Sequence, residues 1–180
     1  MRTKRAKVSY PAPPVVTAEP VSDVVSAALQ AYDVGWEIEE YLAAVNLGIT
    51  DAEITWATEG LSIPMDWYVS ARAAGATNAE LLECRQTERI RPSYLKSRQL
   101  GSTHDQYVCA SSALADSLGT SRGISAYIYC LEAGATHAQA LQAYEFGYQL
   151  DEYASLRAQG LDHDRALNTL EWLANPPAGY

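Results

Sequence analysis

The chain lacks any apolar stretch long enough to cross a membrane. Nowhere in its 180 residues do 18 apolar residues follow one another. The basic start MRTKRAK is followed by VSYPAPPVVTAEP, which has no apolar core of the kind a signal peptide needs. We therefore expect no transmembrane helix and no export by a signal peptide.

Cysteine is scarce. The chain has three cysteines, Cys84, Cys109 and Cys130, which are far apart and form no C-x-x-C pair. An odd number at such spacing is not typical of a disulfide framework or of a zinc site. We predict reduced, largely buried thiols in a protein that is kept out of oxidising compartments.

The sequence also lacks the common catalytic motifs. It contains no G-x-x-x-x-G-K-[ST], no G-x-S-x-G and no H-E-x-x-H. Three histidines, His104, His137 and His163, each stand three residues after a glycine. A zinc site would need their nitrogens within about 2.1 Å of one ion, whereas packed helices lie about 8–10 Å apart. We interpret them as spacers in capping loops, and we predict no enzyme, no metal and no cofactor.

The chain does contain one short sequence pattern that occurs five times. A tyrosine is followed seven residues later by a glycine, and successive glycines are 27, 26, 33 and 26 residues apart. Periods of this length indicate tandem helical repeats. The pairs are Tyr41/Gly48, Tyr68/Gly75, Tyr94/Gly101, Tyr127/Gly134 and Tyr153/Gly160.

Each repeat predicts a helical hairpin. The glycine supplies the left-handed residue that ends a first helix. A threonine or aspartate two residues later begins the second, and T-x-x-E/Q in four of the five repeats predicts a capping box. We predict an all-α fold of roughly ten or eleven short helices in tandem hairpins of about 26 residues. They would form a solenoid-like or compact coiled array, with one repeat domain over 22–180 after an extended arm over 1–21.

Two segments depart from the repeat. Residues 109–126 hold about seven residues more than their equivalents, which predicts either a longer helix or a bulging Ser/Gly loop. The arm contains Pro11, Pro13, Pro14 and Pro20, which favour extended polyproline-like backbone.

Charge is unevenly distributed. The net charge is −9, yet the first seven residues carry Arg2, Lys4, Arg5 and Lys7, so that residues 8–180 hold 9 basic and 22 acidic residues, a net of −13. Such an acidic body repels nucleic-acid phosphates unless basic residues gather somewhere. The stretch 84–98 is the one candidate for such a patch, with Arg85, Arg89, Arg91, Lys96 and Arg98.

The turn AVNLGITDAEI (44–54) is similar to that of DNA-binding helix-turn-helix proteins. The helix that follows, DAEITWATE, has three acidic residues and no basic one, which disfavours a place in a DNA groove. A nucleic-acid-associated regulator that uses these units and the stretch 84–98 is therefore the alternative function.

An arginine follows the repeat tyrosine by four residues in three repeats, at Arg72, Arg98 and Arg157. These arginines could form a positive stripe that binds carboxylates of a partner. They could equally meet the negative end of their own helix and cover the tyrosine ring. The partner-binding candidates are Arg2, Lys4, Arg5, Lys7, Tyr10, Arg72, Arg85, Arg89, Arg91, Lys96, Arg98 and Arg157.

The phrases G-A-T-H-A-Q and G-A-T-N-A-E, preceded by Y-x-x-x-R-x-x-G or a close variant, resemble short tandem helical repeats of actinobacterial and phage proteins. The resemblance covers residues 23–180. It implies a helical-repeat fold and a phage or actinobacterial source, and it transfers no catalytic residue. From the cysteines and the lack of a signal peptide we expect a cytoplasmic or virion-associated protein. We expect a non-enzymatic protein-binding scaffold, such as a phage structural or accessory protein. Its partner would be a host or virion protein or a second copy, rather than a membrane.

Overall fold

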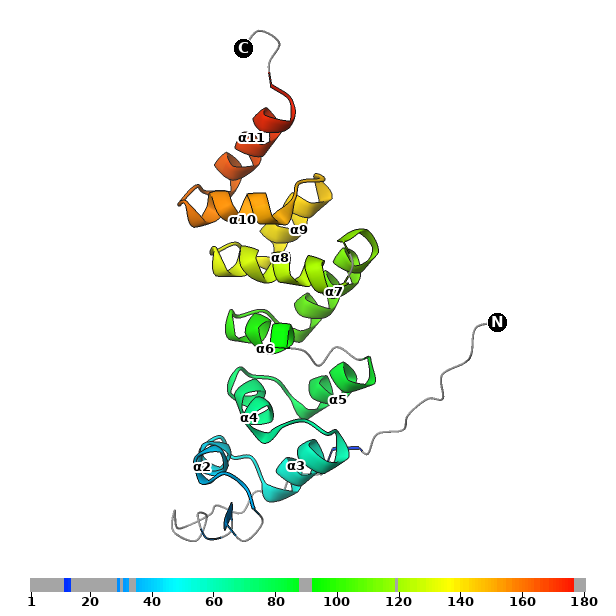
Figure 1. Ribbon diagram of the computed structural model, residues 1–180, viewed down its shortest axis with the longest axis vertical. Coiled ribbons are helices and arrows are strands. Elements are labelled where there is room, and N and C mark those ends of the chain that lie inside the picture. Colours follow the sequence, from blue (N-terminus) through cyan, green and yellow to red (C-terminus); the bar gives the residue numbers. More distant parts are fainter. Residues whose placement is uncertain are drawn as a thin grey trace, which may run out of the picture. The chain divides into compact units, whose positions relative to one another are not determined.

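The computed structural model describes residues 12–13, 29, 31–32, 35–87, 92–118 and 120–176 (Figure 1). The chain divides into two compact units, Met1–Arg91 and Pro92–Tyr180. Unit 1 contains α2 (Ile38–Asn46), α3 (Asp51–Thr55), the π-helical turn η1 (Trp56–Gly60), α4 (Met65–Ala73) and α5 (Asn78–Gln86). Unit 2 contains α6 (Pro92–Gln99), α7 (His104–Leu118), α8 (Thr120–Glu132), α9 (His137–Glu145), α10 (Leu150–Ala158) and α11 (His163–Ala174).

The predicted all-α class is confirmed, because the described ranges contain helices and connecting segments and no strand. Most of the predicted arm over 1–21 lies outside these ranges; within it, Ala12 is exposed and Pro13 is half-buried. The single domain predicted over 22–180 stays a prediction.

The repeat glycines end their helices as predicted. Gly48 follows α2 with φ +71°, a left-handed conformation that a side chain would strain. Its N–H donates to the carbonyl of Val45 at 2.9 Å, and the N–H of Ile49 donates to that of Ala44 at 3.0 Å. This pair of bonds is the Schellman arrangement. The same two bonds and a positive φ recur at Gly75, Gly101, Gly134 and Gly160.

The helix starts are also confirmed. Thr50, Thr77 and Thr136 each form a complete capping box with the Glu or Gln three residues on. Thr103 exchanges the same two hydrogen bonds with Gln106. Asp162 accepts from the N–H of Arg165 at 2.9 Å. Each cap satisfies N–H groups that would otherwise lack a partner at the helix start.

The core of each hairpin is its tyrosine. Tyr41, Tyr68, Tyr94, Tyr127 and Tyr153 are all fully buried. Each hydroxyl hydrogen-bonds the residue ten positions later, which is the first residue of the next helix. The acceptors or partners are Asp51 (2.7 Å), Asn78 (2.7 Å), His104 (3.3 Å), His137 (2.9 Å) and His163 (2.8 Å).

The interpretation of the histidines as spacers is therefore wrong. His104 is buried, and the Nδ1 of all three rings meets a tyrosine hydroxyl inside the hairpin. A buried phenol needs a hydrogen-bond partner, and the carboxylate, amide or imidazole at this position supplies one. Burial, followed by the bond to Asp51, raises the pKa of Tyr41 to about 12.

In unit 2 the first helices of successive hairpins pack on one another, α6 on α8 and α8 on α10 (Figure 1). The extra residues of 109–126 lengthen helices rather than forming a loop, since α7 runs to Leu118 and α8 begins at Thr120. The two long helices are the most extensively packed pair of the unit. Gly123 lies where α8 approaches α7 at Leu114.

Candidate partner-binding groove

The residues predicted to bind a partner fall into separate groups. Seven of them, Arg2, Lys4, Arg5, Lys7, Tyr10, Arg89 and Arg91, lie outside the described residues. The basic stretch 84–98 is divided between the units, with Arg85 at the end of α5 and Lys96 and Arg98 on α6. A partner-binding role for any of these residues stays a prediction.

Arg72 belongs to a buried polar cluster of unit 1. Its Nη1 lies 2.9 Å from Oε1 of Glu53, whose side chain is only 2% exposed. The same nitrogen donates to the hydroxyl of Tyr68 (3.1 Å) and to Oδ1 of Asn78 (2.7 Å). The guanidinium carbon also stands 5.9 Å from the centre of the Tyr68 ring. The charge of Arg72 is thus directed to Glu53 of the preceding hairpin and to two residues of its own hairpin, all within unit 1.

Glu53 is the acceptor of that cluster. Burial alone would raise the pKa of its carboxyl. Hydrogen bonds from the backbone N–H of Thr50, from Arg72 and from Asn78 outweigh burial and hold the pKa below its ordinary value. Asn78 and Arg72 both reach Oε1, at 2.6 and 2.9 Å, and the Thr50 N–H reaches Oε2 at 3.0 Å. Glu53 is therefore an ionised structural group.

Two other basic residues that were predicted to bind a partner, Arg157 and Lys96, contact residues of their own unit. Arg157 donates from Nη2 to the carbonyl of Gly134 at 3.1 Å, at the C-terminal end of α8. Lys96 pairs with Glu132 at 2.9 Å, with both side chains nearly half exposed. Arg98 is half-buried on α6. Arg72 stands over its tyrosine ring as the second interpretation expects, but Arg72 and Arg157 reach groups of the preceding hairpin, Glu53 and the carbonyl of Gly134, rather than the end of their own helix.

An open, mainly apolar groove lies elsewhere, between α10 and α11. A groove of about 670 Å³ is lined there mainly by carbon atoms. We call it the α10–α11 groove and define it by Tyr148, Gln149, Glu152, Leu156, Leu170 and Leu173. Its volume is in the range of ordinary binding pockets.

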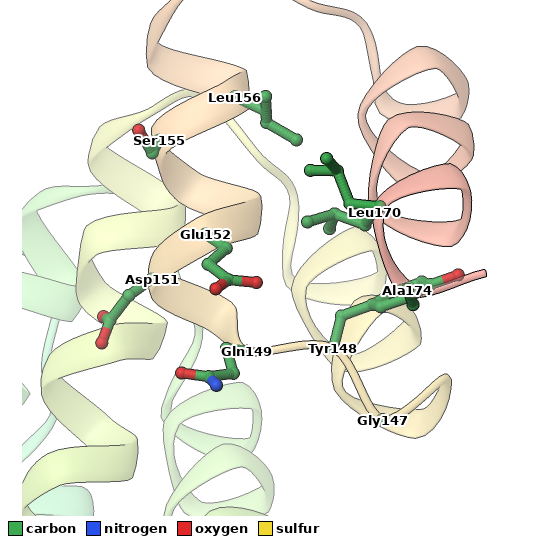
Figure 2. A pocket seen from close by; sticks show the side chains of 10 residues that line it. Gly147, Tyr148, Gln149, Asp151, Glu152, Ser155, Leu156, Leu170 and Ala174 are labelled. Carbon is green, nitrogen blue, oxygen red and sulfur yellow. The ribbon is translucent and has the colours of Figure 1, made fainter. Parts of the chain in front are cut away.

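Figure 2 shows how the groove is built. Leu156 on α10 points toward Leu170 on α11, and Glu152 points between the two helices. Asp151, one residue earlier on α10, points away from α11. Gly147 and Tyr148 form the turn at one end of the groove. The groove therefore has two leucine walls, and its lining includes the carboxylates of Asp151 and Glu152.

The sequence places the groove residues by the same rules as the rest of the repeat. Gly147 has φ +79° and ends α9, which turns Tyr148 toward α10 and α11. Leu170 is 4% exposed because α11 buries it against the hairpin, whereas Leu173, one turn further on, is 60% exposed. In the part of the chain that is described, nothing covers Leu173 or its exposed neighbour Trp172.

A second hollow of about 490 Å³ adjoins the other side of the same turn. Arg122, Glu145, Tyr148 and Asp151 line it. The two hollows together carry three carboxylates and one guanidinium. Among the described residues, Asp151 and Glu152 form no ion pair. The surface around Tyr148 is thus apolar at its floor and acidic at its edge.

Sequence reasoning did not single out this groove. The segment ALQAYEFGYQLDEY (140–153) matches ALQAYDVGWEIEEY (28–41), which aligns Tyr148 with Trp36. The aromatic residue after each of these glycines, Trp36 or Tyr148, was the sequence signal for the groove, which Tyr148 lines. The groove itself depends on how far α10 and α11 stand apart, which a sequence pattern does not give.

Within the described ranges, no group of three or more His, Cys, Asp or Glu side chains could hold a metal ion. No helix there combines the length and the apolar character of a membrane span. Comparison with protein-family models, curated proteins and solved structures finds nothing that matches this chain.

Proposed function

We propose that the protein is a non-enzymatic helical-repeat scaffold that binds another polypeptide in the α10–α11 groove. The observation that carries this proposal is the exposure of Leu173 beside the buried Leu170, in a groove that a peptide side chain could enter. Exposed apolar surface rimmed by polar groups is typical of protein interaction sites.

The recurring hairpin supports the scaffold part of the proposal. The same tyrosine bond, glycine end and threonine or aspartate cap occur in hairpin after hairpin. Hairpins of this kind bury their apolar faces by stacking, so we infer a solenoid-like array. Trp172 and Leu173 of α11 are both more than half exposed.

The charges favour a polypeptide over nucleic acid. Glu145, Asp151 and Glu152 surround the groove and its neighbouring hollow, with Arg122 as the one cation lining them. Carboxylates repel a phosphate backbone and attract lysine and arginine. A partner segment that combines basic and apolar residues fits both features.

The test is a binding measurement on the full-length protein. Three labelled peptides of equal length, one basic and apolar, one acidic and apolar and one basic without apolar residues, are titrated by fluorescence anisotropy. We expect saturable binding of the first alone. Leu173→Asp should weaken that binding about tenfold or more, which corresponds to roughly 1.4 kcal/mol.

Leu47→Asp is the matched control, because Leu47 is an exposed leucine of unit 1. It should leave the affinity unchanged. If no peptide binds saturably, or if both leucine variants weaken binding equally, the groove is not the binding site and the proposal fails.

A further inference from the structure

The α10–α11 groove has an equivalent one hairpin earlier in the chain. The hairpins α8–α9 and α10–α11 are offset by 26 residues, as Gly134 and Gly160 show. When the residues that line the second hollow are shifted by this offset, five of them coincide with residues that line the groove. The groove and the second hollow are therefore the same feature in two successive hairpins. The coinciding pairs are Arg122/Tyr148, Ala126/Glu152, Tyr144/Leu170, Gly147/Leu173 and Tyr148/Ala174.

The start of a helix covers part of this feature in the α8–α9 hairpin. Gln149, Leu150 and Asp151, which also line the second hollow, are the N-cap and the first two residues of α10. Leu150 is buried, and its carbonyl accepts a hydrogen bond from the thiol of Cys130 on α8 at 3.5 Å. The surface between α8 and α9 thus holds a helix that begins with an apolar residue.

The equivalent surface of the α10–α11 hairpin is more open. Cys130 is buried, whereas its equivalent Leu156 is only half-buried. The equivalent of Leu150 is Pro176, which is exposed. Within the described ranges, no helix follows α11. Because successive interfaces of a repeat protein are built alike, the groove fits the first turn of a helix that begins with an apolar residue.

One difference between the two hairpins changes the charge of this surface. Ala126 lines the second hollow together with Asp151 of α10, and its equivalent in the groove is the exposed Glu152. The lining of the groove contains no basic side chain. A carboxylate at this place favours lysine or arginine at the second position of a bound helix. It also favours the positive end of the helix dipole.

The charge of Glu152 disfavours a second copy of this chain as the occupant. In the matching segments 28–41 and 140–153, Ile38 and Glu39 of α2 correspond to Leu150 and Asp151 of α10. Ile38 is 42% exposed, so α2 presents a suitable apolar residue. Glu39 of a second copy would, however, lie beside Glu152, and like charges placed together weaken binding. The charge therefore favours a helix of another protein.

We propose that the α10–α11 groove binds the first turn of an amphipathic helix of another protein. This helix has an apolar residue at its first position and lysine or arginine at its second. The apolar side chain lies between Leu156 and Leu170, which face each other across the groove, and the cation pairs with Glu152 (Figure 2). Amphipathic helices commonly bind apolar grooves in this way. The inference rests on the proposed function and names the form and chemistry of its partner segment.

The experiment compares three labelled peptides of equal length on the full-length protein by fluorescence anisotropy. The probe peptide begins with threonine, leucine and lysine, and a covalent link between side chains four residues apart stabilises its helix. The second peptide has glutamate in place of that lysine. The third has no link and has proline in its second turn, which breaks the helix. We expect the probe to bind about tenfold more tightly than either, because its helix is preformed and its charge is complementary.

Glu152→Lys tests the charge. It should weaken binding of the probe about fivefold or more and strengthen binding of the glutamate peptide. Glu39→Lys, a reversal at an exposed glutamate of α2, should leave both affinities unchanged. Light scattering then compares the molar masses of the wild-type protein and Leu173→Asp, which we expect to be equal.

Three results would overturn the inference. Equal affinity for the proline peptide would mean that the groove binds an extended segment. Equal affinity for the lysine and glutamate peptides, or an unchanged preference in Glu152→Lys, would mean that Glu152 does not select a cation. A molar mass that falls in Leu173→Asp would make a second copy the occupant. In the first two cases saturable binding of the probe leaves the proposed function standing, whereas the absence of binding by any peptide means that both proposals fail.

Discussion

Gly123 of α8 lies directly against Leu114 of α7. A Cβ on Gly123 would stand 2.6 Å from the Cβ of Leu114 and 2.9 Å from its carbonyl oxygen. Two non-bonded carbon atoms cannot stand 2.6 Å apart. The two helices can therefore approach this closely only because residue 123 has no side chain. The two longest helices of unit 2 pack against each other at this point.

Gly123→Ala should therefore destabilise the protein. Alanine is the better helix former by about 1 kcal/mol, but overpacking costs about 1–3 kcal/mol, and here backbone as well as side chain must move. We expect a net loss of up to about 2 kcal/mol in the free energy of unfolding, measured by urea denaturation.

Gly134→Ala is the comparison for that measurement. Gly134 has φ +78°, and a Cβ there would meet nothing within 4 Å. The free energy of unfolding of Gly134→Ala should fall only by the cost of a left-handed backbone at alanine, about 1–2 kcal/mol. Crystal structures separate the two causes: α7 and α8 should move apart in Gly123→Ala, while the helices of Gly134→Ala stay in place. An unmoved α7–α8 pair in Gly123→Ala would contradict the close-packing account.

Arg72→Ala should be costly because it leaves Glu53 buried without its cation. Removing one partner of a buried ion pair typically costs about 3 kcal/mol, and Glu53 is 2% exposed. Arg157→Ala is the matched control at the same repeat position, since Arg157 contacts a carbonyl rather than a carboxylate. It should cost about 1 kcal/mol or less. Equal losses in urea denaturation would mean that the cluster around Glu53 does not stabilise unit 1.

The stability of the protein should depend on His137 as pH changes. Burial lowers the pKa of His137 in the folded protein, so below pH about 6.5 the unfolded chain takes up a proton that the folded chain resists. This contribution is fully present above the unfolded pKa and is lost as pH falls through it toward the folded pKa. The free energy of unfolding should thus rise between about pH 5 and pH 7.

His137→Asn should flatten that rise. In the α4–α5 hairpin the equivalent residue is Asn78, which accepts a hydrogen bond from the Tyr68 hydroxyl. Asparagine can therefore replace the hydrogen bond of His137, and it does not titrate. Denaturation at several pH values compares the two proteins. An unchanged slope in His137→Asn would show that His137 does not carry the effect.

The three thiols should differ in reactivity. Cys109 is exposed, whereas Cys84 and Cys130 are buried. Burial, followed by the nearby charge of Asp151, raises the pKa of Cys130 to about 12, so little thiolate is available for reaction. We expect one thiol to react with a disulfide reagent in the native protein and three in denaturant. A second fast thiol in the native protein would contradict the packing of α5 or α8.

The sequence predicted the hairpins well where local chemistry determines them. Gly48 needs a left-handed backbone, and Thr50 needs the N–H of Glu53, and both requirements can be read along a few residues. The same reading predicted that residues 109–126 could lengthen a helix, but it left the loop open because glycine and serine suit either.

The tyrosine bonds were missed although their signal was present. Position ten after each tyrosine is always Asp, Asn or His, all of which can accept a hydrogen bond. The same residue types also suit the first turn of a helix, and the reach of a tyrosine ring across a hairpin is a tertiary distance that the pattern does not give. The α10–α11 groove was missed for the same kind of reason, since the exposure of Leu173 depends on what packs on α11.

The most direct test of the account is a map of where the chain binds a peptide. Full-length ¹⁵N-labelled protein is titrated with the basic and apolar peptide of the anisotropy test, and backbone amide shifts are followed by NMR. The account predicts saturable shifts concentrated at 147–156 and 170–174, and their loss in Leu173→Asp. Saturable shifts centred on any other helices, or none at all, would contradict it.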